Sequence, residues 1–315
     1  MKYTKRFFTA FLFVLGLVGL LILSSHLFLP KSNKEGLGME DARANGIVGE
    51  KDNTVDILIL GDSESYTSLI PLQLWRDTGY TSYICGTSRQ TLDYTKIMLR
   101  KAFNKQSPRI VFLETNAIFR KQSKSNILFT RLGEKFSVFR YHNRWKALGW
   151  SDIKESADFT WSDDYKGFRH STIINPVKKT DYIKSTQEAE HIPKLNRFCV
   201  QTIKEFCDTN GARLILYSAP STVNWNMARH NSIQALASEL NCDYIDMNLL
   251  TKEIQIDWRK DTRDKGDHLI FFGAKKVTSY ISDYLSETGL LTGHRGDPDY
   301  AKWDEALNRF ETVVS

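Results

Sequence analysis

The sequence predicts an α/β fold built on a parallel, doubly wound sheet. Short, continuous runs of apolar residues alternate with longer amphipathic segments along most of the chain. A strand that is buried on both faces has such a run, because helices cover both faces of a parallel sheet. Glycine or small polar residues follow several of the runs and mark turns. A repeated order of strand, helix and strand is typical of this fold class.

The first predicted strand, 55–60, has the clearest signal, since five of its six residues are apolar and Gly61 ends it. Four further strands are predicted by apolar runs at 81–86, 109–116, 213–218 and 242–247. Apolar residues at helical spacing predict helices at 65–80, 93–104, 192–210, 231–240 and 273–284. Pro71 lies inside the first of these helices, and the helix can begin there instead.

Between residues 117 and 191 the alternation of strands and helices lapses. This segment is polar and rich in Phe, Tyr and Trp, and it is too long for a plain loop. We therefore expect a mostly helical insertion after the third strand. This insertion would cover the functional site as a lid. Its aromatic side chains either pack within the lid or form a surface on which sugars stack.

The amino-terminal segment predicts a membrane anchor. Residues 7–29 carry no formal charge and would form a helix of about 35 Å, enough for a hydrocarbon core of ~30 Å. Lys2, Lys5 and Arg6 precede this segment, and basic residues stay on the cytoplasmic side. A cleaved signal peptide is the alternative, but 24–26 makes a poor cleavage site. We expect a single-pass protein of the cell membrane, with the remaining chain outside.

These observations divide the chain into four parts. Residues 1–30 form the cytoplasmic terminus and the anchor. Residues 31–52 are polar and glycine-containing, which predicts a flexible tether. Residues 53–290 form the extracytoplasmic domain, including the insertion at 117–191. Residues 291–315 form a carboxyl-terminal tail with a weakly amphipathic end.

Composition narrows the classes of function. The net charge of +6 is spread along the 315 residues, which suits an anionic cell surface or phospholipid headgroups. No nucleic-acid-binding motif accompanies the charge, so we expect no nucleic-acid partner. The cysteine spacing matches neither a metal motif nor a disulfide framework, which favours four buried, free thiols at Cys85, Cys199, Cys207 and Cys242. We predict neither a cofactor nor a metal.

One serine and one histidine are the candidates for chemistry. Ser63 follows the first strand, and open α/β folds place ligands at the carboxyl ends of their strands. His268 lies in a polar loop directly before the last helix of the α/β alternation, which puts it at the same edge. A serine nucleophile needs such a base, and the base needs an acceptor for its other ring nitrogen. Asp264 and Asp267 are both close enough in sequence to be that acceptor.

This pattern resembles the SGNH (GDSL-type) hydrolase superfamily. Ile59 to Ser63 is similar to the first block of that family, and Asp264 to His268 is similar to its last block. Gly86 and Asn116 follow the second and third strands, where the family has its two further oxyanion-binding residues. The family's usual acid stands three residues before the histidine, and that residue here is a lysine. The resemblance therefore leaves Asp264 and Asp267 as alternatives.

The resemblance implies a flavodoxin-like three-layer α/β/α sandwich and a serine O-acyltransferase or ester hydrolase. Together with the anchor, it is similar to accessory proteins of teichoic-acid D-alanylation and of alginate or cellulose O-acetylation. Those proteins imply a membrane-bound O-acyltransferase as partner and a cell-surface glycan or polymer as substrate, which carries acetyl or similar O-acyl groups. The alternative is a non-catalytic glycan-binding or scaffold protein that keeps the fold with a degenerate site.

Overall fold

The computed structural model describes residues 2–177 and 180–314, and it divides into two compact units. Unit 1 comprises Met1–Ala42 and Gln122–Thr160. Unit 2 comprises Arg43–Lys121 and Trp161–Ser315. The predicted site residues all belong to unit 2.

Unit 2 is built on a five-stranded parallel sheet in the order β2-β1-β3-β4-β5. Its strands are β1 Ile57–Gly61, β2 Ser82–Gly86, β3 Ile110–Glu114, β4 Arg213–Ser218 and β5 Asp243–Asp246. This is the flavodoxin-like strand order, with the connection reversing direction beside β1. The predicted α/β fold class is confirmed, and each of the five predicted strands is present.

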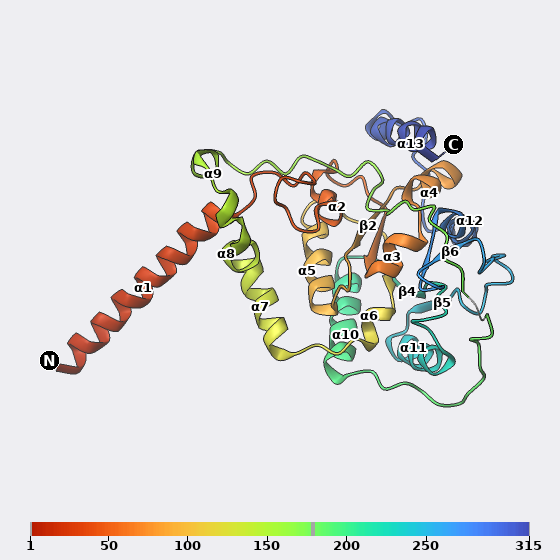
Figure 1. Ribbon diagram of the computed structural model, residues 1–315, viewed down its shortest axis with the longest axis horizontal. Coiled ribbons are helices and arrows are strands. Elements are labelled where there is room, and N and C mark those ends of the chain that lie inside the picture. The colour runs from red at the N-terminus through yellow and green to blue at the C-terminus, as the bar shows by residue number, and fades with distance from the viewer. Residues whose placement is uncertain (1, 178–179, 315) are drawn as a thin grey trace. The chain divides into compact units, whose positions relative to one another are not determined.

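Helices cover both faces of the sheet. They are α3 Ser63–Ser68, α4 Pro71–Thr78, α5 Leu92–Phe103, α10 Lys194–Thr209, α11 Met227–Leu240 and α12 Phe271–Thr288. Helix α12 packs against α3 and α4, whereas α5 packs against α10 (Figure 1). The predicted helix at 65–80 is divided in two, because Leu69 and Ile70 are extended and Pro71 starts a new helix with its fixed φ.

The core of unit 2 lies between the sheet and these helices. All five residues of β1 and all five of β3 are buried, as expected for strands covered on both faces. The ring of Phe112 on β3 is fully buried and meets the ring of Tyr217 on β4 edge to face, with centroids 5.8 Å apart.

Removing this ring is expected to destabilise unit 2. Phe112→Ala should lower the free energy of unfolding by about 3–5 kcal/mol, because the substitution removes buried apolar atoms and leaves a cavity in their place. Phe198→Ala, at a site 60% exposed on α10, should change it by less than about 0.5 kcal/mol. Urea unfolding of the full chain in detergent micelles measures both values. Equal effects of the two substitutions would contradict the placement of Phe112 in the core.

The insertion after β3 is helical only in its first half. Its helices are α6 Asn116–Phe119, α7 Lys124–Lys135, α8 Ser137–Tyr141, η2 His142–Ala147 and α9 Trp150–Lys154. From Glu155 to Pro193 the described residues form almost no regular structure. Backbone hydrogen bonds hold part of this stretch on unit 2, from Arg169 to Tyr66 and from Phe271 to Ser171. The insertion is thus divided between the units, since residues 122–160 belong to unit 1 with the amino-terminal helix and the remainder belongs to unit 2. That the insertion covers the site as a lid stays a prediction.

The segment after α1 and the carboxyl-terminal segment are both more ordered than their composition predicts. In the predicted tether 31–52, residues 42–49 form α2 Ala42–Asn45 and η1 Gly46–Gly49, and Ile47 is fully buried in the core. The carboxyl-terminal segment forms η3 Pro298–Tyr300 and α13 Ala301–Val314. Helix α13 packs on α4, where Trp75 Nε1 donates to Asp304 Oδ1 at 2.8 Å. A few apolar residues in each segment are sufficient to dock it.

Candidate active site

Ser63 starts α3 immediately after β1, at the carboxyl edge of the sheet. The Asp62 side chain caps the helix by accepting from the Glu64 amide at 3.1 Å. Gly61 makes the tight turn possible, because a Cβ there would lie 2.5 Å from the Cβ of Glu114. The nucleophile candidate is thus held at a rigid junction of strand and helix, and it is half-buried.

His268 joins Ser63 to a carboxylate. Its Nε2 lies 2.9 Å from Ser63 Oγ, and its Nδ1 lies 3.0 Å from Asp264 Oδ2. A proton on Nδ1 would be donated to Asp264, which leaves Nε2 free to accept the serine proton. This is the geometry that a serine nucleophile, a general base and an orienting acid require. The structure therefore brings the predicted serine and histidine together.

A two-stranded hairpin carries the candidate base and both candidate acids. It consists of β6 Thr262–Arg263 and β7 His268–Leu269, which pair antiparallel. Its connecting loop has three successive left-handed residues, Asp264, Lys265 and Gly266, with φ of 54°, 61° and 88°. This curl brings the Asp264 side chain back beside the ring four residues later. Two of the three are not glycine, so the loop holds some backbone strain.

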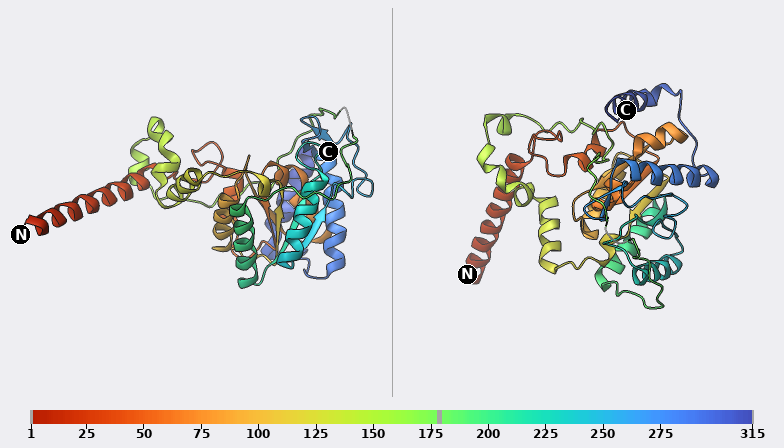
Figure 2. Two further views of the ribbon diagram at one scale, coloured as in Figure 1. Left: turned by 90° about the horizontal axis from the view of Figure 1, so that it is seen from below. Right: turned by 45° about the vertical axis from the view of Figure 1, so that its right-hand side comes forward.

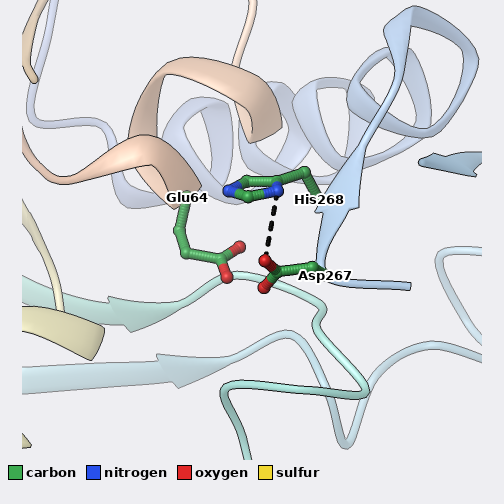
Figure 3. Close-up of side chains that lie close together, drawn as sticks. All are labelled: Glu64, Asp267 and His268. Carbon is green, nitrogen blue, oxygen red and sulfur yellow. Dashed lines mark ion pairs between the residues drawn. The ribbon is translucent and has the colours of Figure 1, made fainter. Parts of the chain in front are cut away.

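The second candidate acid, Asp267, lies on the same side of the His268 ring, but its closer contact is with Asn224. Its Oδ2 is 3.5 Å from His268 Nδ1, which is within ion-pair range (Figure 3). Its Oδ1 accepts from Asn224 Nδ2 at 2.5 Å. The same Asn224 amide donates to Glu64 Oε1 at 2.8 Å. Burial raises the pKa of Asp267. Distance favours Asp264 as the hydrogen-bond partner of the histidine, and Asp267 belongs to a network with Asn224.

Three buried carboxyl groups, Asp62, Glu64 and Glu114, surround the start of α3. Arg120 Nη2 approaches Asp62 Oδ2 to 2.5 Å and supplies the nearby positive charge. Burial raises the pKa of Glu64 well above its ordinary value, and the charges of Glu114 and Asp62 raise it further. Burial likewise raises the pKa of Glu114, with Asp62 adding to the effect. Glu64 and Glu114 therefore keep their protons to higher pH than exposed carboxyl groups do.

This burial predicts that the stability of unit 2 falls as the pH rises. Above the ordinary pKa of 4.5, the unfolded chain releases the Glu64 proton while the folded chain keeps it. The free energy of unfolding then falls by up to ~1.4 kcal/mol per pH unit until the folded pKa is passed. Glu64→Gln removes the charge and keeps an acceptor for Asn224. It should flatten this fall and raise the Tm at pH 8.

Thermal unfolding of the full chain from pH 5 to pH 8 measures this effect. Glu188→Gln, at an exposed position, is the matched control and should leave the slope of Tm against pH unchanged. A Glu64→Gln slope equal to that of the unsubstituted chain would show that Glu64 is not held neutral in the folded state.

The two predicted oxyanion residues differ in their surroundings. Gly86 lies opposite Gly61 in the sheet register, and a Cβ on it would meet Ser65 Oγ at 2.2 Å. The backbone of β2 therefore passes close to the serine turn. Asn116 Nδ2 donates to Asp62 Oδ2 at 3.0 Å, which uses one of its two N–H groups. Their role toward an oxyanion stays a prediction.

Arg229 on α11 connects the parts of the site, and no local pattern in the sequence indicates this role. Its Nη1 donates to Asn116 Oδ1 at 3.2 Å and to the Asn224 carbonyl at 2.6 Å. Its Nε donates to the Glu190 carboxylate at 3.1 Å, and its guanidinium lies over the Phe119 ring. Because Arg229 holds Oδ1 of Asn116, the amide nitrogen must face Asp62. Arg229 is therefore a positioning residue for Asn116.

The loss of this contact is expected to affect catalysis rather than binding. Arg229→Ala should lower the kcat for a small ester about 10- to 100-fold with a smaller change in KM, since displacement of a group by about 1 Å can cost 10²-fold. Arg197→Ala is the matched control, because Arg197 pairs with Glu239 at the surface. Steady-state kinetics separate kcat from KM. A rise in KM alone would show that Arg229 acts on substrate binding.

Glu64, Asp267 and His268 are close enough for one oxygen or nitrogen of each to lie within 4.8 Å of the others (Figure 3). In this structure hydrogen bonds account for all three. Asn224 donates to both carboxylates, and His268 faces Ser63 and Asp264. The site is thus explained without a cation, and the absence of a metal stays a prediction.

Comparisons with known proteins find similar solved structures only. No protein-family model and no curated protein sequence matches the chain. A GDSL-like lipase from Bacteroides thetaiotaomicron is 13% identical, with a TM-score of 0.35 over 74% of this chain and 88% of that one. A putative acylhydrolase from Bacteroides fragilis is 11% identical, with a TM-score of 0.41 over 82% of this chain and 100% of that one.

A third similar structure is a two-domain esterase active on acetylated mannans. It is 11% identical, with a TM-score of 0.39 over 79% of this chain and 52% of that one. These identities and TM-scores are low for all three structures. The chemistry of the present site therefore has to be inferred from its own side chains.

Proposed function

We propose that this protein is a serine esterase or O-acyltransferase of the extracytoplasmic membrane surface. The observation that supports this most directly is the hydrogen-bonded series of Ser63, His268 and Asp264. A serine hydroxyl is a weak nucleophile until a base within hydrogen-bond reach accepts its proton. The spacing of 2.9 Å and 3.0 Å along the series meets that requirement.

The reaction has two halves. In the first, Ser63 Oγ attacks the ester carbonyl as His268 Nε2 takes its proton, and the tetrahedral intermediate forms. The imidazolium then returns the proton to the departing alkoxide, which leaves an acyl group on Ser63 and a free alcohol. In the second half, water or an acceptor hydroxyl attacks the acyl group by the same proton route. Asp264 stabilises the imidazolium in both halves.

The oxyanion of each intermediate needs preorganised donors. We assign this role to the backbone N–H groups of Ser63 and Gly86 and to the second N–H of the Asn116 amide. One such donor is typically worth about 3 kcal/mol in the transition state. The contact of Asn116 with Arg229 is what holds its amide in the required orientation.

The substrate proposal is an O-acetyl or similarly short O-acyl group on a cell-surface glycan or polymer. A shallow pocket next to the serine turn is lined in part by Glu64, Asn116, Asn224, Trp225 and Arg229. A larger pocket lies at the amino ends of β4 and β5, at the opposite edge of the sheet from Ser63.

The last part of the proposed function is an anchor in the membrane. Helix α1 Lys2–Phe28 contains a segment, Tyr3–Phe28, that is long and apolar enough to cross a membrane, and its most apolar 18-residue window has a mean hydropathy of 2.6. With Lys5 and Arg6 at its start, the positive-inside rule places unit 2 outside the cytoplasm. A membrane-bound O-acyltransferase that exports the acyl group is the partner that such an arrangement needs for transfer.

Transfer and hydrolysis are distinguished by the acyl acceptor. Full-length protein in detergent micelles is given p-nitrophenyl acetate with and without an added oligosaccharide. Acylated oligosaccharide at the expense of acetate would support transfer, and acetate alone would support hydrolysis. No release of p-nitrophenol, together with glycan binding that survives Ser63→Ala, would instead indicate a binding protein with a degenerate site.

A further inference from the structure

The helical part of the insertion is built around the outer end of α1. Within unit 1, helix α1 contacts α8, η2 and α9, and Figures 1 and 2 show these elements at its carboxyl-terminal end. Arg144 on η2 donates from Nη1 to the carbonyl of Phe28, the last residue of α1, at 2.8 Å. Its Nη2 lies 2.6 Å from Asp152 Oδ1 on α9. One arginine therefore fixes η2 and α9 to the end of the helix.

This level along α1 corresponds to a membrane surface if α1 spans the bilayer. At ~1.5 Å per residue, about 20 residues cross a hydrocarbon core of ~30 Å. Counted from Phe7, where the uncharged stretch begins, the core ends near Leu27. The Arg144 contact with Phe28 thus lies at the boundary between acyl chains and headgroups.

The side chains at this level are unusually apolar for exposed positions. Trp145 on η2 is 62% exposed, and Trp150 and Ile153 on α9 are 79% and 56% exposed. Trp150 and Ile153 are three residues apart, so they lie on one side of α9. The other tryptophans behave differently: four of them in unit 2 are at least 92% buried, namely Trp75, Trp225, Trp258 and Trp303. Exposed tryptophan is therefore a local feature of η2 and α9.

The charge around these side chains suits a phospholipid surface. Residues 122–160 contain seven lysines and arginines against four aspartates and glutamates. Lys146 is exposed and lies over the Trp145 ring, and Lys154 is exposed at the end of α9. Tryptophan rings with neighbouring lysines are the pattern of membrane interfaces, where the ring enters the boundary and the ammonium reaches the headgroups.

We propose that Trp145, Trp150 and Ile153 form a membrane-contact face, which enters the outer boundary of the phospholipid bilayer that α1 spans. This inference rests on the anchoring part of the proposed function. It assigns these residues a role different from the two predicted for the aromatic side chains of the insertion, which are lid packing and a sugar-stacking surface. The face would fix unit 1 at the bilayer surface through side chains as well as through the span.

Spin-label accessibility in lipid nanodiscs tests the membrane-contact face. The full chain carries Cys242→Ser, since the other three cysteines are buried. Single labels are placed by Trp150→Cys, Ile153→Cys, Leu15→Cys in α1 and Phe198→Cys on the exposed side of α10. The nanodiscs contain phosphatidylcholine and phosphatidylglycerol. Oxygen concentrates in lipid, so it should relax the spin labels at 150 and 153 several-fold more than a water-soluble nickel chelate does. At 198 the nickel chelate should relax the label more than oxygen does.

Three other results would overturn the inference. Labels at 150 and 153 that resemble the one at 198, while the label at 15 is in lipid, would refute the face and leave the anchor intact. A label at 15 in water would refute the anchor, and the face with it. Spin–spin broadening at 150 that disappears on dilution with unlabelled protein would show that a second copy of the chain covers this surface.

Discussion

Ser63→Ala is expected to abolish covalent labelling by a fluorophosphonate probe and to lower ester turnover by about four to six orders of magnitude. The reason is that acyl transfer passes through the serine oxygen, and loss of one member of a triad removes most of what the set contributes. Labelling of the full-length protein followed by gel fluorescence measures the first effect, and p-nitrophenyl acetate hydrolysis measures the second.

Ser65→Ala is the matched control for this substitution. Its hydroxyl lies two residues further along α3 and donates to the Asp62 carbonyl at 2.7 Å. It should therefore keep the probe reaction. Equal labelling of the unsubstituted chain and of Ser63→Ala would remove the nucleophile assignment, and with it the proposed enzyme function.

Asp264→Asn is expected to lower kcat by about 10²- to 10⁴-fold, whereas Asp267→Asn should lower it less than about tenfold. Asp264 is the acceptor 3.0 Å from His268 Nδ1, and an asparagine there no longer stabilises the imidazolium or the required tautomer. Asp267 has its closer partner in Asn224, and an asparagine at that position keeps an oxygen for this contact.

Steady-state kinetics of the two variants, with His268→Ala as the reference for full loss of the base, decide between the acids. A larger loss for Asp267→Asn would reassign the acid to the more buried carboxyl group. Equal and small losses for both would show that either carboxylate can orient the ring. Measuring kcat of both variants at pH 6 and at pH 8 shows whether a loss of activity reflects only a changed protonation state at one pH.

The sequence was sufficient for the parts of the molecule that depend on local pattern. The β1 and β3 runs are apolar throughout because both of their faces are buried, and each prediction of a strand held. Ser63 was found because it follows such a strand, and His268 because it directly precedes the last helix of the α/β alternation, which puts both at one sheet edge. The hydrogen bond between them follows from that shared edge.

Other parts depend on contacts that no local pattern encodes. Arg229 and Asn116 are 113 positions apart, and their contact exists only after α11 has packed beside the site. The short distance between Asp264 and His268 depends on left-handed backbone conformations at three successive residues, 264–266. Only one of the three is glycine, so the sequence does not indicate these conformations. The pairing of residues 122–160 with α1 likewise joins segments about a hundred residues apart, and no local pattern predicts it.

The hairpin of β6 and β7 has a consequence for how such a site can change over time. Each of its strands has only two residues, and they pair with each other rather than with the central sheet. Ser63, by contrast, is fixed by β1 and by the packing of α3. The length of the Asp264 loop can therefore vary without a change in the hydrogen bonds of the central sheet. In this chain the candidate acid Asp264 stands four positions before His268, and a two-stranded ribbon outside the central sheet carries this spacing.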